Sequence, residues 1–175
     1  IILILSPFFL VIGLLVFFED GFPIIFTQKR FGRGNIYFNM YKFRTMKTNT
    51  PNVATNLLKN PNKYKLKVGG FLRKFSLDEL PNLINIIKGD MSFVGPRPAL
   101  YNQDDLIRLR RISGISKLKP GLTGWAQING RDKLSLNQKI VLEKEYLDKK
   151  NFSFDVKIFF RTFIFVFFRN DDVNH

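Results

Sequence analysis

The sequence predicts a small, helix-rich α+β domain that is associated with a membrane. Three observations support this class: an apolar run at residues 1–18, short stretches with strand character at residues 24–26 and 36–46, and apolar residues at helical spacing over residues 136–147. With 175 residues, of which 45% are hydrophobic, the chain can bury the core of about one domain. We expect a re-entrant N-terminal helix and amphipathic interfacial helices to make the membrane contacts.

The N-terminal run is apolar except for Ser6, Pro7 and Gly13. As one helix it would extend about 27 Å, slightly less than the ~30 Å hydrocarbon core of a bilayer. Because Pro7 removes a helical hydrogen bond and kinks the chain, Ser6 and Pro7 predict a helix that enters the membrane, bends and returns. A plain spanning helix and a signal peptide are the alternatives, although residues 19–22 form a poor cleavage site. We expect residues 1–20 to form this helix and residues 21–175 the remaining domain.

The charge of the chain indicates an anionic partner. Lys and Arg number 28 against 14 Asp and Glu, which gives a net charge of +14. Such a balance favours nucleic acid, an anionic membrane surface or phosphate-bearing substrates. Many of the 20 Phe residues lie in the terminal segments, which favours the membrane over nucleic acid.

The C-terminal segment and two residue types restrict the chemistry further. The apolar part of residues 155–169 is too short to span a bilayer and carries basic residues, so we expect an interfacial helix, with a buried core helix as the alternative. The chain has no cysteine, which excludes disulfides and thiolate chemistry. Its single histidine, His175, disfavours histidine acid–base catalysis and a multi-histidine metal site.

Two adjacent carboxylates, Asp78 and Glu79, stand at a predicted helix start. Pro81 belongs in the first turn of that helix because it lacks an N–H, and Gly89 is expected to cap its C-terminal end. The positive end of a helix attracts phosphate oxygens, and an ionised Asp that faces a phosphate can be a nucleophile. The alternative is a Ser-x-x-Glu capping box formed by Ser76 and Glu79.

Several cations flank these carboxylates in the sequence. Strand alternation places Lys42 and Arg44 on one face of the stretch at residues 36–46, where they face either phosphate or solvent. Arg73 comes five residues before Asp78 and could stabilise a transferred phosphoryl group or rest on anionic lipid. Arg97 follows a Val-Gly-Pro turn that would fix its backbone.

Two further regions carry candidate residues. Residues 117–131, rich in Gly and Pro, predict a structured loop in which Trp125 stacks on a nucleotide or anchors the loop in the core or at the membrane interface. Glu143 shares a helix face with Leu136, Ile140 and Leu147. A carboxylate on an apolar stripe needs a cationic or metal partner; the alternatives are that Glu143 pairs with Lys139 or that its side chain extends to solvent.

These motifs closely resemble the signature of the bacterial sugar transferases, also called monotopic polyprenol-phosphate phosphoglycosyl transferases. The matching residues are Ser-Leu-Asp-Glu-Leu-Pro at 76–81, Lys-Gly-Asp-Met-Ser at 88–92 and Val-Gly-Pro-Arg-Pro at 94–98. Further matches follow the family order at residues 28–32, 41–46 and 120–131. The resemblance covers nearly the whole chain.

The resemblance implies an enzyme that transfers a sugar 1-phosphate from a UDP-sugar to polyprenol phosphate and releases UMP. It implies Mg²⁺, bound by Asp78 and Glu79, although Glu79 could instead activate the acceptor phosphate. It also implies a covalent intermediate on Asp78 and a catalytic domain on the cytoplasmic face of the bacterial inner membrane. The product would initiate synthesis of a surface glycan. Membrane lipid is then a partner and nucleic acid is not, while the sugar, the pathway and the oligomeric state stay undetermined.

The resemblance also assigns roles to single residues. The implied phosphate-binding residues are Arg97, Arg73, Lys42, Arg44 and Arg131, and the implied nucleotide-sugar loop contains Gly124, Trp125 and Gln127. Glu143 stands where the family usually has Asp, with Tyr146 matching the family Tyr, and is therefore a possible additional carboxylate. Family members carry the Ser-Pro break in a re-entrant helix with a basic segment before it, so we expect the chain to be a fragment of a longer product.

Two rival hypotheses remain. A non-catalytic basic protein could bind membrane or nucleic acid through charge alone, and its binding would then fall steeply with salt. A transferase could also let the acceptor attack the donor directly, without a covalent intermediate.

Overall fold

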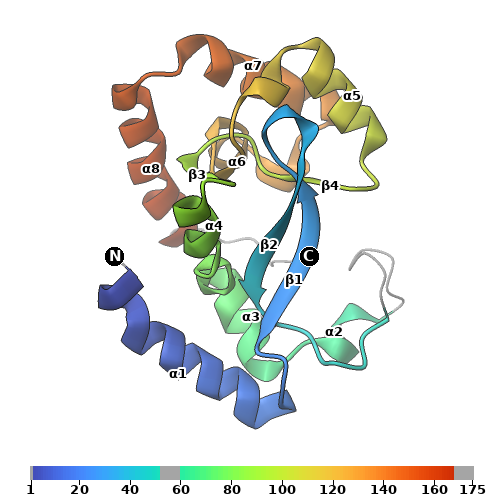
Figure 1. The fold of residues 1–175 in the computed structure, drawn as a ribbon, viewed down its shortest axis with the longest axis vertical. Coiled ribbons are helices and arrows are strands. Elements are labelled where there is room, and N and C mark those ends of the chain that lie inside the picture. Colours follow the sequence, from blue (N-terminus) through green and yellow to red (C-terminus); the bar gives the residue numbers. More distant parts are fainter. Residues whose placement is uncertain (1, 52–59, 168–175) are drawn as a thin grey trace. The chain divides into compact units, whose positions relative to one another are not determined.

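The structure, a computed structural model, describes residues 2–51 and 60–167. The elements are mostly helices with a few short strands, which confirms the mixed α and β composition (Figure 1). The chain forms two compact units, each discontinuous in sequence. The first unit contains described residues from 2–27 and 41–83, and the second contains residues from 28–40 and 84–167.

The first unit is helical. It contains α1 (Ile2–Asp20), α2 (Pro61–Tyr64), α3 (Lys67–Lys74), the 3₁₀ turn η3 (Leu77–Glu79) and the start of α4 (Asn82–Lys88). Helix α1 continues through Pro7. Among the described residues, no helix combines the length and the apolar character needed to cross a membrane.

One side of α1 belongs to the core of the first unit. Ile12 and Val16 pack with Phe43, Leu66 and Leu72, all of them buried. At the C-terminal end of α1, the carboxylate of Glu19 accepts hydrogen bonds from the backbone N–H groups of Lys67 and Val68. Because the first N–H groups of a helix have no partner within it, Glu19 caps α3.

The predicted strands form a hairpin that contributes residues to both units. Strand β1 (Ile25–Phe31) and strand β2 (Tyr37–Phe43) flank the 3₁₀ turn η1 (Arg33–Asn35). The short strand β4 (Ala99–Leu100) adds to β1 antiparallel, with Arg30 opposite Leu100 and Phe31 opposite Ala99, so the strand order is β2-β1-β4. Both strands lie where the sequence predicted them, although β1 is longer and β2 ends before Arg44.

The second unit is built around a short parallel strand pair. Strand β3 (Ser92–Val94) pairs with β5 (Gly121–Thr123), with Ser92 opposite Gly121. A Cβ atom on Gly121 would lie 2.1 Å from the backbone nitrogen of Gly95, so the two backbones can approach only because this residue is glycine. The remaining elements are α5 (Asp104–Ile112), η4 (Ile115–Lys117), α6 (Trp125–Ile128), η5 (Arg131–Lys133), α7 (Leu136–Lys149) and α8 (Phe152–Phe167).

The prediction of a loop without regular elements over residues 117–131 is wrong, because β5 and α6 lie within it. Both are short, and β5 depends on pairing with β3 rather than on a local pattern. Helix α7 begins at a capping box formed by Ser135 and Gln138. Helix α8 buries Ile158 and leaves its other side exposed, where the large apolar residues are Phe152, Phe160, Phe163 and Ile164.

Candidate active site

The carboxylates of Asp78 and Glu79 lie in η3, just before α4. Both residues are buried, with exposed fractions of 8% and 9%. Ser76 precedes them with a φ of 55° and its side chain makes no capping hydrogen bond, so the capping-box alternative is wrong. Helix α4 starts at Asn82 directly after Pro81, which agrees with the predicted position of the pair just before a helix.

Glu79 is held by a cation from β2. The Nζ atom of Lys42 lies 2.6 Å from Oε1 of Glu79, and both side chains are largely buried. Such a charge-assisted hydrogen bond fixes the position of the carboxylate. The structure therefore places Lys42 against the carboxylate pair, whereas strand alternation predicted only that it faces phosphate or solvent.

Asp78 has its own cationic neighbour, Arg73. Burial lowers the pKa of the Arg73 guanidinium, and the negative charge of Asp78 partly opposes that shift. The Nε–H of Arg73 donates to Oγ1 of Thr45 at 2.8 Å. The first unit thus brings together Asp78, Glu79, Lys42 and Arg73. The contact of Thr45 with Arg73 was not predicted from the sequence.

Arg44 does not share the surroundings of Lys42. Its guanidinium binds the Asp20 carboxylate and donates to the backbone oxygens of Gly21 at 2.6 Å and Pro23 at 2.5 Å. Strand β2 ends at Phe43, so the alternation that would place Lys42 and Arg44 on one face does not extend to Arg44. Arg44 instead holds the turn that follows α1.

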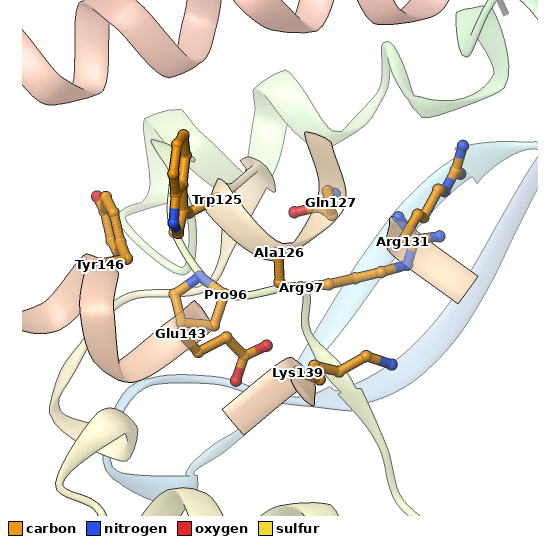
Figure 2. Close-up of a pocket in the computed structure, with 10 residues that line it drawn as sticks. Pro96, Arg97, Trp125, Ala126, Gln127, Arg131, Lys139, Glu143 and Tyr146 are labelled. Atoms are coloured by element: carbon orange, nitrogen blue, oxygen red, sulfur yellow. The ribbon is translucent and has the colours of Figure 1, made fainter. Parts of the chain in front are cut away.

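A pocket in the second unit gathers the other candidate residues (Figure 2). Its cationic side chains come from three places: Arg97 follows β3, Arg131 lies in η5 and Lys139 lies on α7. Figure 2 shows Trp125 and Tyr146 at one end of the pocket and the charged ends of these three residues toward the other. Lys139 was not predicted as a pocket residue, since helical spacing suggested only a pairing with Glu143. An anionic ligand fits the basic end of this pocket.

The loop at β5 and α6 is fixed by packing. The Nε1–H of Trp125 donates to Oε2 of Glu145 at 2.8 Å, and the ring centroid lies 5.0 Å from that of Phe154. Trp125 therefore anchors the loop in the second unit. A Cβ atom on Gly124 would lie 2.1 Å from the backbone oxygen of Gly95, so Gly124 is required for the approach of two loops. Gln127 lines the pocket and donates through Nε2 to the oxygen of Leu122 at 3.2 Å.

Glu143 forms a buried ion pair with Arg110. Its two oxygens accept from Nε and Nη2 of Arg110 at 2.7 and 2.5 Å, and Glu143 is 2% exposed. The suggested pairing with Lys139 is wrong. The apolar helix face signalled that a partner was needed, but Arg110 lies on α5, 33 residues away, where no local pattern points to it.

Tyr146 lies one turn from Glu143 and is buried. Its hydroxyl donates to Oδ1 of Asp155 at 2.7 Å. Burial, together with the hydrogen bond and negative charge of Asp155, raises the pKa of Tyr146 above its ordinary value of 10.0. Tyr146 therefore stays protonated and ties α7 to α8.

The carboxylate oxygens of Asp78 and Glu79 are the candidate donors for the Mg²⁺ that the motif resemblance implies. In the described ranges, no group of three or more His, Cys, Asp or Glu residues is arranged to hold a metal. Mg²⁺ at phosphoryl-transfer sites is bound by one or two carboxylates, with waters and substrate phosphates completing its shell. Asp78 and Glu79 fit that requirement, although Lys42 already occupies one oxygen of Glu79.

Comparison with known proteins identifies the family. Residues 1–169 match the family model described as bacterial sugar transferase. The chain belongs to this family. Membership of this family, which the sequence motifs predicted, is therefore confirmed.

Three curated relatives show the extent of the similarity. The chain is 45% identical over 139 residues to an uncharacterized sugar transferase, EpsL, of Bacillus subtilis. This match covers 79% of the chain and 67% of EpsL. It is 40% identical over 171 residues to the UDP-glucose:undecaprenyl-phosphate glucose-1-phosphate transferase of Escherichia coli, covering 93% of this chain and 36% of that protein. It is 38% identical over 160 residues to the undecaprenyl-phosphate galactose phosphotransferase of Salmonella typhimurium, and the match covers 82% of this chain and 33% of that protein. The chain thus spans only about a third of the last two relatives.

Proposed function

We propose that this chain transfers a sugar 1-phosphate from a UDP-sugar to polyprenol phosphate, giving polyprenol diphosphate sugar and UMP. The observation that carries the proposal is the buried pair of Asp78 and Glu79, each with a cation beside it, within the family motif. The printed names of the Escherichia coli and Salmonella relatives, which refer to sugar phosphate transfer and undecaprenyl phosphate, support the same reaction.

The proposed chemistry has two steps. An oxygen of Asp78 attacks the phosphorus that bears the sugar, a bond from this phosphorus to oxygen breaks, and UMP leaves. A phosphate oxygen of polyprenol phosphate then attacks the same phosphorus and releases the Asp78 carboxylate. Each step forms one phosphorus–oxygen bond and breaks another, so no oxidant or reductant is needed.

The surrounding residues have separate roles in this proposal. Lys42 holds Glu79 in place, and Arg73 places positive charge beside Asp78, where negative charge is redistributed during attack. Mg²⁺ bound by oxygens of Asp78 and Glu79 would neutralise phosphate charge. Arg97 and Arg131 would bind a substrate phosphate in the pocket of the second unit, because a planar guanidinium suits two phosphate oxygens.

The membrane is part of the proposal because the acceptor is a lipid. Helix α1 leaves large apolar side chains exposed on the side away from its core contacts; they are Phe8, Leu10, Val11, Leu14, Leu15 and Phe18. Contiguous exposed apolar surface of this kind marks a membrane or protein contact. We retain the re-entrant helix with its break at Ser6 and Pro7, and a catalytic domain on the cytoplasmic face, as parts of this proposal. The product would initiate a surface glycan.

A UMP assay tests the reaction. Purified protein is given a panel of UDP-sugars with Mg²⁺, with and without polyprenol phosphate. We expect turnover with acceptor, and without it a burst of at most about one UMP per site, with a phosphosugar adduct on the Asp78 peptide in mass spectrometry. Asp78→Asn should abolish the burst and lower turnover on the order of 10⁴-fold.

A matched control uses Asp148→Asn, since Asp148 lies on α7 and binds Lys144 at an exposed position. This variant should keep normal turnover. Normal turnover of wild type without any burst would favour direct attack by the acceptor and leave Asp78 as a metal ligand. No UMP from any donor would favour a non-catalytic binding protein.

A further inference from the structure

The hydroxyl of Thr45 contacts the cation beside Asp78. Nε of Arg73 lies 2.8 Å from Oγ1 of Thr45, and Thr45 is 7% exposed. We propose that Thr45 is a positioning residue that fixes the Arg73 guanidinium beside the nucleophile Asp78. This inference rests on the proposed function, because it assigns Thr45 a part in the same transfer.

The backbone around Thr45 holds the hydroxyl in a defined place. The carbonyl oxygen of Thr45 accepts the N–H of Leu66 at 3.1 Å, immediately before α3. A Cβ atom on Gly69 would lie 2.4 Å from the same oxygen, so α3 can approach Thr45 this closely only with glycine there. Gly69 and Arg73 are four residues apart on α3 and share one helix face. The approach of α3 at Gly69 therefore places Arg73 at the hydroxyl of Thr45.

A neutral partner suits the role of Arg73. A carboxylate in the place of Thr45 would neutralise the guanidinium, as Asp20 does for Arg44. A hydroxyl instead accepts one N–H and leaves the positive charge to act on Asp78. Arg73 is partly buried, and loss of the hydrogen bond from its Nε–H to Thr45 would loosen the position of the guanidinium relative to Asp78.

Each of the four residues at 42–45 thus contacts a different partner. Lys42 binds Glu79, Phe43 packs in the core, Arg44 binds Asp20 and Thr45 binds Arg73. One short segment at the end of β2 therefore binds Glu79 directly and binds Arg73, the cation whose charge interacts with Asp78. Removing the hydroxyl of Thr45 should disturb Asp78 without touching Lys42 or Glu79.

Thr45→Val tests the hydroxyl with little change of shape. We expect kcat for UMP formation to fall about tenfold or more, the scale of one hydrogen bond to a charged group, while KM for the UDP-sugar changes less than about twofold. Thr45→Ser keeps the acceptor and should retain kcat within about threefold. If Thr45→Val fails to fold, Thr45→Ala takes its place.

The matched control is Thr162→Val in the second unit. Oγ1 of Thr162 pairs with Oγ1 of Thr123 at 2.7 Å, so this variant also removes a hydrogen-bonded threonine hydroxyl. It should keep wild-type kcat. Equal losses in Thr45→Val and Thr162→Val, or in Thr45→Val and Thr45→Ser, would overturn the positioning role.

A double-mutant cycle separates positioning from general destabilisation. Once Arg73→Met has removed the guanidinium, adding Thr45→Val should lower kcat by less than about twofold. Multiplicative losses in the double variant would show that Thr45 acts independently of Arg73 and would overturn the inference.

Chemical labelling keeps this inference distinct from the proposed function. Arg73 should react faster with the arginine reagent phenylglyoxal in Thr45→Val than in wild type, while Arg44 serves as an internal reference in the same peptide map. An unchanged rate at Arg73 would overturn the positioning role even if the enzyme is active. Faster labelling in a protein that releases no UMP would support the contact and contradict only the proposed reaction.

Discussion

At the scale of the residue, buried and partly buried charges in each unit are paired with groups from distant parts of the chain. Asp78 and Glu79 could be found from their motif and helix position, whereas strand alternation left open whether Lys42 faces phosphate or solvent. The partner of Glu143 could not, because Arg110 lies on another helix and is brought to it only by folding. The pairings of Arg44 with Asp20 and of Thr45 with Arg73 likewise link distant segments. Local patterns report which groups need a partner and not which group supplies it.

The Arg110 and Glu143 pair leads to a prediction about stability. Arg110→Met should cost about 3–5 kcal/mol, because it leaves the buried Glu143 carboxylate without a counter-ion. The double variant Arg110→Met/Glu143→Leu should recover most of that loss, since two apolar side chains can replace a buried ion pair. Urea unfolding of detergent-solubilised protein measures both values.

The same variants decide whether Glu143 has a chemical role. If the ion pair is structural, the double variant should regain UMP formation together with stability. A double variant that is stable but inactive would make Glu143 a functional carboxylate. A double variant as unstable as Arg110→Met would contradict the ion-pair argument.

At the scale of the element, strong periodic patterns predicted well and pairing-dependent elements did not. Helix α7 was visible from its apolar spacing, and α1 from its apolar run. Strand β5 and helix α6 were missed because they are three and four residues long. Their positions are set by β3 and by the contact of Gly121 and Gly124 with Gly95, which only the folded chain provides.

The turn after α1 should respond to acid. The N–H of Thr48 and the guanidinium of Arg44 hold the pKa of Asp20 below its ordinary value of 3.8. Because the folded pKa is lowered, the stabilisation by Asp20 is complete above about pH 4 and is lost as pH falls through the folded pKa. Asp20→Asn should therefore lower Tm at pH 6, and the difference from wild type should shrink toward pH 3. A Tm difference that is constant over this range would contradict the assignment.

At the scale of the whole molecule, composition and charge predict a membrane-associated protein, while the two compact units depend on long-range contacts. Each unit combines segments from separate parts of the chain, which periodicity cannot reveal. The predicted boundary near residue 20 separated a membrane helix from the remaining domain. In the structure, α1 packs in one core with Phe43, Leu66 and Leu72, so this boundary does not separate two packed cores. The net charge of +14, the apolar run at residues 1–18 and the Phe-rich C-terminal segment led to the membrane prediction, and the structure adds that α1 and α8 carry exposed apolar side chains.

Membrane attachment is the last prediction and belongs to this scale. If apolar insertion holds the protein, it should stay in membranes through washes with about 1 M salt, where charges are screened beyond ~3 Å. It should also stay after alkaline carbonate. Phe160→Asn/Ile164→Asn, which changes two exposed residues of α8, should increase release by carbonate, whereas Lys144→Gln, at an exposed position of α7, should not. Complete release of wild type by salt alone would instead identify a peripheral protein held by its positive charge.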